Sequence, residues 1–299
     1  MPFLWGGLGV LAFSFTLPAT RESVGAFGAV TVGLGRAVPA AALAAVALLC
    51  ARVSVPRRDQ LVPLALVAGG AVVGFPLLTA LALRGVGAAH GAIFVGLLPM
   101  ATAVAAVLRA GERPRPAFWV TASAGAVAVL VFAAVRGAGA PRTEDLLMLA
   151  AVACAAVAYA EGGALARSTP GWQVISWALL LALPVVLPLT VAAVLAHPPA
   201  DPSPAAWAGL AYVSVVSMFL GFVVWYRGLA AGGVAKVGQI QLAQPVLTVG
   251  WSALLLSEPV DAATGIAAVA VLVLTVLTQR EKRATRAPEA TMLVPVDAR

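Results

Sequence analysis

This sequence is poor in charge and in the residues that build metal sites or covalent catalytic sites. Of its 299 residues 10% are charged, two are His, two are Cys, and Asn is absent. The absence of Asn excludes N-glycosylation. The sequence contains no GxxxxGK(S/T), HExxH or Cys–His cluster, which argues against ATP hydrolysis and against a zinc site. We therefore expect no cofactor, no metal and no catalytic residue; the protein is predicted not to be an enzyme.

Apolar residues, in contrast, are in large excess. They make up 62% of the chain, and the mean hydropathy is +0.99. A soluble domain is about half apolar and about a quarter charged, so the solvent expected for this chain is the lipid bilayer. The net charge of +7 does not indicate nucleic-acid binding, because the basic residues lie in short loops between apolar runs. Loops of this kind are typical of an anionic membrane face.

The apolar runs predict an all-α polytopic membrane protein with ten transmembrane helices. Each run is long enough to cross a hydrocarbon core about 30 Å thick. The runs are continuous rather than alternating, which favours helices over a membrane barrel. The predicted spans are residues 3–20, 26–50, 61–83, 88–109, 116–135, 146–166, 172–196, 205–229, 235–256 and 261–279. Cys50 and Cys154 fall inside these spans and are interpreted as small apolar side chains.

The basic residues set the expected orientation. With the N-terminus inside, fourteen of the nineteen Lys and Arg residues lie in inner loops or flanks. The outer loops hold Arg21, Arg84, Arg136 and Arg142. Since basic residues gather on the cytoplasmic side, both termini are predicted to be cytoplasmic. The expected location is the cell (inner) membrane.

The chain contains one pattern twice, at a spacing of 146 residues. The matched pairs are Gly87 and Gly233, Pro99 and Pro245, and Glu112 and Glu258. The spacing matches the fourth span to the ninth, so the repeat contains five helices. An odd repeat places its two copies in opposite orientations across the membrane. Inverted repeats are characteristic of secondary transporters that work by alternating access.

The repeated Pro and Glu residues are interpreted as structural. Pro99 and Pro245 lie inside spans, where each leaves a carbonyl four residues earlier without its helical partner. Glu112 and Glu258 end their helices, where each is expected to accept hydrogen bonds from the backbone of a neighbouring helix end. His90 and Lys236 also match at 146; each lies either at the membrane interface or in a gate.

Two charged residues lie deep inside predicted spans, where charge is costly. Arg36 is either a counter-charge for an anionic or carboxylate substrate, or a structural cation bound to carbonyls or to an acid. Glu161 is either a proton-coupling residue, since burial favours the protonated form of a carboxyl group, or a partner for a basic or hydroxyl group. The sequence does not show whether the two interact.

A polar stripe on the ninth span adds further cavity residues. Gln241, Gln244, Thr248 and Trp251 follow one another at steps of three or four residues, so they share one helical face. They either line a cavity or hydrogen-bond a neighbouring helix. The remaining cavity residues predicted from other spans are Ser14, Thr16, Tyr159, Ser217 and Trp225. The cavity is expected between the two halves, lined by the first four spans of each.

The order of these motifs resembles the EamA family of the drug/metabolite transporter superfamily. The residues that carry the resemblance are Leu98–Pro99, Gly111–Glu112–Arg113, Gln244–Pro245, Ser257–Glu258–Pro259 and the run from Trp225 to Leu229. Ser257 stands where the family often has Gly. The resemblance implies a membrane carrier, often an exporter, of amino acids, other metabolites or drugs.

Taken together, the sequence predicts a secondary transporter built from three segments. These are a first five-helix repeat at 1–139, a second at 140–279 and a disordered cytoplasmic tail at 280–299. The expected partners are a small-molecule substrate and the lipid bilayer, with no nucleic acid; a homodimer is left open. The alternatives are a channel or uniporter and a membrane sensor or structural protein that does not transport.

Overall fold

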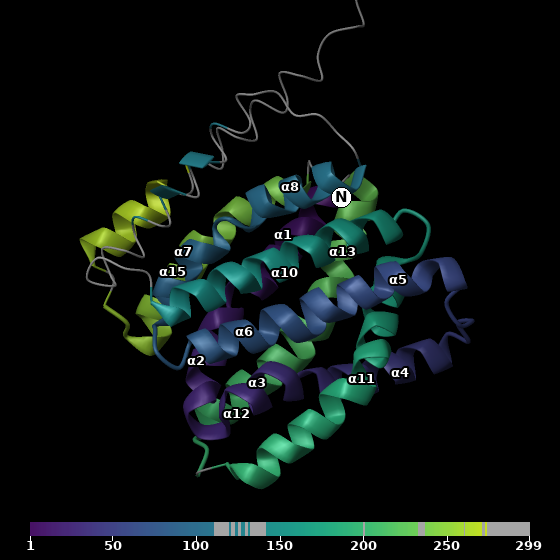
Figure 1. The fold of residues 1–299 in the computed structure, drawn as a ribbon, viewed down its shortest axis with the longest axis horizontal. Helices are drawn as coiled ribbons and strands as arrows, with labels where there is room; N and C mark the ends of the chain where they lie inside the picture. The colour runs from purple at the N-terminus through teal and green to yellow at the C-terminus, as the bar shows by residue number, and fades with distance from the viewer. Residues whose placement is uncertain are drawn as a thin grey trace, which may run out of the picture.

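The computed structural model of this chain is built from helices (Figure 1). It describes residues 1–110, 142–199, 201–232, 237–259 and 261–270, and a few single residues between 120 and 131 and at 273. No strand occurs among these residues, so the all-helical prediction is confirmed for them. Glu112, Lys236, the tail and most of the predicted spans 116–135 and 261–279 lie outside this part of the chain. The count of ten spans therefore stays a prediction.

Seven helical stretches in the described part are long and apolar enough to cross a membrane. They are α1–α2 (Pro2–Ser14 and Thr16–Phe27), α3–α4 (Ala29–Gly35 and Ala37–Cys50), α5–η1–α6 (Arg58–Val67, Ala68–Gly74 and Phe75–Ala82), α7–α8 (Ala88–Val95 and Leu98–Ala110), α10 (Thr143–Leu165), α11 (Gly171–Ala196) and α12–η2–α13 (Pro204–Ala211, Tyr212–Leu220 and Gly221–Gly232). A shorter stretch joins the 3-10 helix η3 (Gly238–Ala243) to α15 (Gln244–Leu256). Residues 262–270 are helical as well.

Prolines explain where three of these stretches break. In each, a helix ends at the residue four positions before a proline. Proline has no N–H to donate, so the carbonyl at that position loses its helical partner. The pairs are Ser14 and Pro18, Gly35 and Pro39, and Val95 and Pro99. The breaks place polar backbone inside the membrane-spanning part of the molecule, where other groups can reach it.

The third span of each repeat contains a π-helical segment. These segments are η1 and η2. A shift of 146 residues moves η1 onto residues 214–220, which fall inside η2. A π-helix is rare and is frequently found at functional sites. Because π-helices occur at equivalent places in both repeats, the third span of each half is a candidate part of a functional site.

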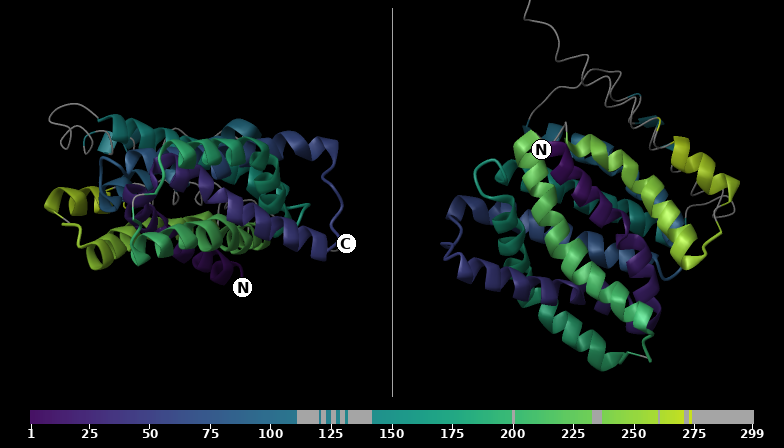
Figure 2. Two further views of the ribbon diagram at one scale, coloured as in Figure 1. Left: turned by 90° about the horizontal axis from the view of Figure 1, so that it is seen from below. Right: turned by 180° about the vertical axis from the view of Figure 1, so that it is seen from behind.

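The helices of the two repeats are interleaved. In Figure 1, α10 of the second repeat runs between α6 and α8 of the first, and the right-hand view of Figure 2 shows α1 beside α13. Glycines allow the closest approaches: a Cβ at Gly9 would lie 3.1 Å from the Cβ of Trp225, and one at Gly70 would collide with the carbonyl of Cys154. Many large apolar side chains remain exposed, among them Leu49, Leu195 and Leu254. An apolar exterior is what a membrane protein presents to lipid.

The loops that the structure describes lie at two ends of the bundle (Figure 1). At one end, the side-chain amide of Gln60 donates to the hydroxyl of Thr169 at 2.8 Å, and Arg227 lies 4.2 Å above the ring of Trp5. At the other end, Arg21 donates to the carbonyl of Leu83 at 2.6 Å. The first group belongs to loops predicted to be cytoplasmic, and the second to loops predicted to be outside.

Candidate functional site

A small cavity lies where elements of both repeats meet. Its lining comes from α1, α2, the break between α3 and α4, η1, α6, α10, η2, α13 and α15. The residues are Phe13, Thr16, Leu17, Arg36, Ala71, Phe75, Pro76, Ala155, Tyr159, Ser217, Met218, Phe222 and Gln244. The volume of about 20 Å³ gives room for about one water molecule. A larger molecule enters only when the surrounding side chains or helices move apart.

The two repeats contribute equivalent positions to this cavity. Three pairs of lining residues are separated by 146 residues, the spacing of the sequence repeat. They are Phe13 and Tyr159, Ala71 and Ser217, and Pro76 and Phe222. Ala71 and Ser217 both lie in the π-helical segments. The cavity therefore sits where the two halves of the duplication face each other, and the π-helices form part of its wall.

Arg36 is the one charged residue in this lining. It lies at the break between α3 and α4, where Pro39 interrupts the helix, and it is 1% exposed. Within the described residues, its Nε and Nη1 atoms have no hydrogen-bond partner. Neither of the two ion pairs found there involves it. The structural-cation alternative required carbonyls or an acid around this guanidinium, and the described residues provide no such partner.

Hydroxyl and amide groups line the same cavity. The hydroxyls of Thr16 and Ser217 are 2.8 Å apart and join α2 to η2. Tyr159 is buried, with the side chain of Gln241 beside its hydroxyl. Gln244 is buried, and its Oε1 has no partner in the described part of the chain. These groups give the cavity hydrogen-bonding capacity around one positive charge.

An aromatic cluster forms another part of the wall. The ring of Phe13 lies 5.0 Å from that of Phe222, edge to face, and 6.3 Å from that of Tyr159, stacked. Trp225 also packs on Phe13, at 6.1 Å, but it is 1% exposed and does not line the cavity. Rings at these separations pack favourably, so they give the cavity a firm apolar side.

Several residues predicted to line the cavity instead bind a neighbouring helix. Thr248 donates to the carbonyl of Ser14 at 2.7 Å, and the indole N–H of Trp251 donates to the hydroxyl of Ser14 at 3.1 Å. The carbonyl is available because Pro18 cannot donate to it. The polar residues of α15 therefore have two different surroundings. Gln244 lines the cavity, whereas Thr248 and Trp251 hydrogen-bond to Ser14 of α1.

Glu161 lies on α10, two residues after Tyr159, and is 4% exposed. It does not line the cavity, and neither does Gln241. Glu161 and Arg36 form no ion pair. Arg36 therefore lines the cavity, whereas Glu161 does not.

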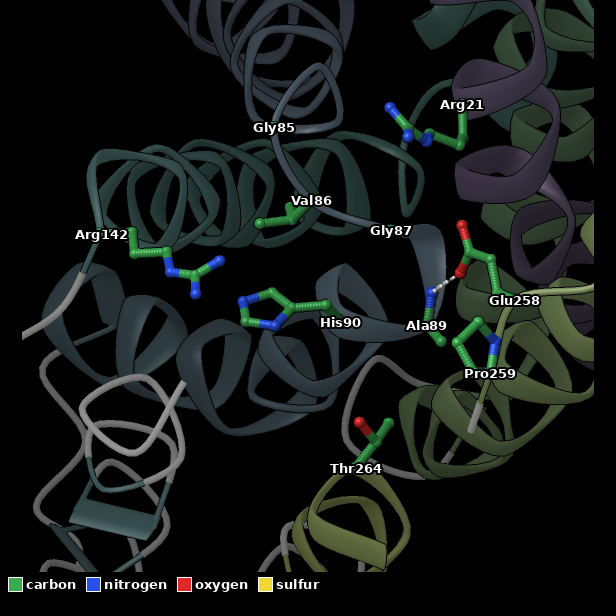
Figure 3. A pocket seen from close by; sticks show the side chains of 10 residues that line it. All are labelled: Arg21, Gly85, Val86, Gly87, Ala89, His90, Arg142, Glu258, Pro259 and Thr264. Carbon is green, nitrogen blue, oxygen red and sulfur yellow. Dashed lines mark hydrogen bonds between the residues drawn. The ribbon is translucent and has the colours of Figure 1, made fainter. Parts of the chain in front are cut away.

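A second, wider pocket of about 460 Å³ opens at the predicted outer end (Figure 3). Its lining includes Arg21, His90, Arg142 and Glu258. A ring nitrogen of His90 lies 2.6 Å from Oδ1 of Asp145, which is fully buried. The backbone N–H of Arg142 donates to Oδ2 of the same carboxylate at 2.8 Å. One acid therefore ties the start of α7 to the start of α10.

The sequence reading missed Asp145, although a signal was present. An acid three residues after the residue that precedes a helix commonly reaches back to that residue's N–H. Asp145 stands in this relation to Arg142 at the start of α10. The charge looked like part of a loop, and only the fold brings His90 to it.

Glu258 joins the two repeats at the edge of this pocket. Its carboxylate accepts hydrogen bonds from the backbone N–H groups of Ala88 and Ala89, both at 2.9 Å. These are the first two residues of α7, whose N-terminus carries partial positive charge. The sequence predicted that this carboxylate accepts hydrogen bonds from the backbone of a neighbouring helix end, and it does so at the start of α7. The structure places this helix end 169 and 170 residues away, in the other repeat.

A packed layer separates the two pockets. A Cβ at Gly91 would lie 3.3 Å from Met148 and 3.4 Å from Leu17. Leu17 lines the inner cavity, while Ala89 and His90, just before Gly91, line the outer pocket. At this point the side chains of Leu17 and Met148 pack against α7 between the two pockets.

Comparison with known proteins gives three findings. The profile described as the EamA-like transporter family matches residues 1–134 and 142–279. The uncharacterized transporter YdeK of Bacillus subtilis (strain 168) is 47% identical over 263 residues, which cover 85% of this chain and 88% of that protein. A protein crystal structure matches 96% of this chain and 99% of its own, with a TM-score of 0.64 at 20% identity. The last match is a likeness of fold.

Proposed function

The chain belongs to the EamA-like transporter family, and from this premise we propose that it is a secondary transporter that exports small metabolites by alternating access. Membership and the transporter relative support a multi-pass membrane transporter with a role in transport rather than catalysis. The resemblance leaves amino acids and drug-like compounds as substrate classes. The proposed location is the cell (inner) membrane, with both termini cytoplasmic.

One observation carries the proposal. The inner cavity is lined by residue pairs that the 146-residue repeat relates, such as Ala71 with Ser217. Equivalent elements facing one central site are what two half-transporters need to open that site to either side in turn. The packed layer at Gly91 supports a conformation closed on the outer side.

In this proposal the halves are residues 1–139 and 140–279, in opposite orientations. The fourth span of each half carries a Pro, and is followed by a Glu, that recur in the other half. The gathering of alternate loops at the two ends of the bundle supports the odd number of helices in each half. A hydrogen bond such as that from Ala88 to Glu258 then forms and breaks as the halves move.

Counterflow in proteoliposomes tests the transport function. Vesicles loaded with each member of a broad metabolite panel should take up the same labelled compound faster than unloaded vesicles. This trans-stimulation is expected of a carrier, since the loaded site returns across the membrane faster than the empty one. Flux without trans-stimulation would instead support a channel or uniporter. No flux for any panel member, with protein-free liposomes as control, would support a sensor or structural protein.

Glu161 is the proposed proton-coupling residue, because it is a buried acid within the span, two residues after Tyr159 of the cavity lining. The other buried acid of α10, Asp145, lies in its first turn beside His90. Glu161→Gln should abolish uptake driven by a pH gradient and leave counterflow exchange intact. Exchange needs the site alone, whereas driven uptake needs the proton. Driven uptake that persists unchanged in Glu161→Gln would assign Glu161 a structural role.

A further inference from the structure

The inner cavity holds a positive charge for which the described residues provide no counter-charge. The guanidinium of Arg36 is 1% exposed, and two of its nitrogens have no partner among the described residues. Burying an ion without a partner costs several kcal/mol, and one-sided removal of a partner is strongly destabilising. A protein tolerates such a group when something else supplies the opposite charge.

The composition of the lining indicates the net charge of the solute that would balance Arg36. None of the thirteen described lining residues is Asp or Glu. A cationic solute, or the ammonium group of an amino acid, would therefore meet no carboxylate there. An anion would meet Arg36. The cavity thus favours a solute with net negative charge over a zwitterion or a cation.

The donors around Arg36 fit a carboxylate. Arginine presents its N–H groups as a planar fork that matches the two oxygens of a carboxylate. In the pair formed by Thr16 and Ser217, one hydroxyl donates to the other, so the second keeps its own proton to donate outward. Both hydroxyls belong to the same lining as Arg36.

The other lining residues indicate which kind of group accompanies the carboxylate in the substrate. Phe13, Phe75 and Phe222 line the cavity with Leu17 and Met218. Rings and flexible apolar chains of this kind favour an aromatic or branched apolar group. A small inorganic anion would leave this surface unused.

We propose that the transported substrate is an organic anion with one carboxylate and an aromatic or branched apolar body, whose carboxylate binds the guanidinium of Arg36. The inference rests on the proposed transport function and names the substrate class of that same cavity. It replaces the broad classes of amino acids and drug-like compounds with organic carboxylates. Glu161, outside the lining, takes no part in this recognition.

Three probes with one body and different charges test the proposal. They are 3-phenylpropanoate, L-phenylalanine and 2-phenylethylamine. Binding to the purified full chain in detergent is measured by calorimetry and by the shift in Tm. We expect 3-phenylpropanoate to bind, with an affinity at least tenfold above that of the other two. Tighter binding of phenylalanine or phenylethylamine, or no binding of any probe, overturns the assignment.

Variants of Arg36 then test whether its guanidinium binds the carboxylate of the probe. Arg36→Met should weaken binding of 3-phenylpropanoate by about 10- to 100-fold, the loss expected for charge-assisted hydrogen bonds. Arg36→Lys should recover part of it, because the charge remains and the fork is lost. Arg227→Met is the matched control, since Arg227 lies above Trp5 and away from the cavity. Equal affinity in Arg36→Met and the unchanged chain overturns the proposal.

Thermal stability separates recognition from a structural role. Without ligand, Arg36→Met should have a Tm equal to or above that of the unchanged chain, because a buried unpaired charge is removed. A large fall in Tm, or failure to fold, would show that Arg36 supports the fold and would overturn the proposal. Binding that follows the prediction but without counterflow in proteoliposomes would contradict the transport function and leave the anion site intact.

Discussion

Arg36 and Glu258 show two outcomes for a charged residue in an apolar chain. The carboxylate of Glu258 accepts from two backbone N–H groups at the N-terminus of α7. Arg36 is more deeply buried, and its Nε and Nη1 have no partner in the described part of the chain. A satisfied charge stabilises a contact within the protein, whereas an unsatisfied one is free to bind a ligand of opposite charge. This contrast supports the proposed roles, in which Glu258 holds the repeats together and Arg36 binds the substrate.

Removing the charge of Glu258 should weaken the contact between the repeats. In Glu258→Gln the amide can accept only through its oxygen, and the N-terminus of α7 loses a negative neighbour. Because hydrogen bonds to charged groups contribute about 1.5–3 kcal/mol, we expect a clearly lower Tm in detergent. Asp59→Asn is the control, since Asp59 forms an exposed ion pair with Arg57, and such pairs contribute about 0–1 kcal/mol. Equal Tm values for the two variants would contradict the role of Glu258.

Ser257 adopts a backbone conformation suited to glycine. It ends α15 with φ of 51° and ψ of 29°, in the left-handed region. An L-residue pays about 1–2 kcal/mol there, and glycine avoids this cost. Ser257→Gly should therefore raise the Tm. The exposed Ser168→Gly, outside the left-handed region, is the matched control and should lower the Tm or leave it unchanged. A lower Tm for Ser257→Gly would refute the strain argument.

At the scale of elements, the close contact of η1 with α10 depends on one glycine of an adjacent pair. A Cβ at Gly70 would collide with the carbonyl of Cys154, whereas a Cβ at Gly69 meets nothing within 4 Å. Gly70→Ala should therefore destabilise the protein by about 1–3 kcal/mol, the usual cost of overpacking. Gly69→Ala should be neutral or stabilising, because alanine favours the helix. Thermal unfolding in detergent compares the two, and equal effects would argue against close packing here.

The sequence predicts the helical elements well for a physical reason. A span must satisfy its backbone internally and match the bilayer thickness, so run length alone locates it. The breaks are also visible, because Pro18, Pro39 and Pro99 each end a helix four residues earlier. The repeat spacing then relates lining residues such as Phe13 and Tyr159.

The partners of polar side chains could not be predicted in this way. Thr248 and Trp251 share a helical face with Gln244, yet they bind Ser14, more than 230 residues earlier. The reason is the carbonyl freed by Pro18, which competes with the cavity for donors. Periodicity reports which residues share a face, but tertiary packing decides what that face meets. For the same reason Asp145 was missed as the partner of His90.

At the scale of the whole molecule, the inner cavity is much smaller than the outer pocket, and packed side chains lie between residues that line the two. The inner cavity holds about 20 Å³, and the outer pocket about 460 Å³. Leu17 and Met148 fill the space between them around Gly91. Opening toward the outside requires this layer to part, together with the contacts of Glu258 and Asp145 that hold the start of α7. In the proposed alternating-access mechanism, these contacts between the repeats would control access to the cavity that the repeats share.

The opposite orientation of the repeats can be tested with pairs of equivalent positions. Arg84 and Ala230 are both exposed and lie 146 residues apart, as do Arg57 and Ser203. Cys50 and Cys154 are first replaced by Ser and Ala, and one cysteine is introduced at a time. An impermeant maleimide should label Arg84→Cys and Ser203→Cys in intact cells. It should label Ala230→Cys and Arg57→Cys only after permeabilisation.

Each position serves as the control for its equivalent 146 residues away. If each repeat has five helices, a shift of 146 residues must carry every loop to the other face of the membrane. Within each pair, then, one cysteine reacts from outside and its equivalent does not. Labelling of both members from the same side would require an even number of helices per repeat. That result would leave a duplicated bundle of parallel halves, in which the shared cavity could not open to either side by exchanging the roles of the two halves.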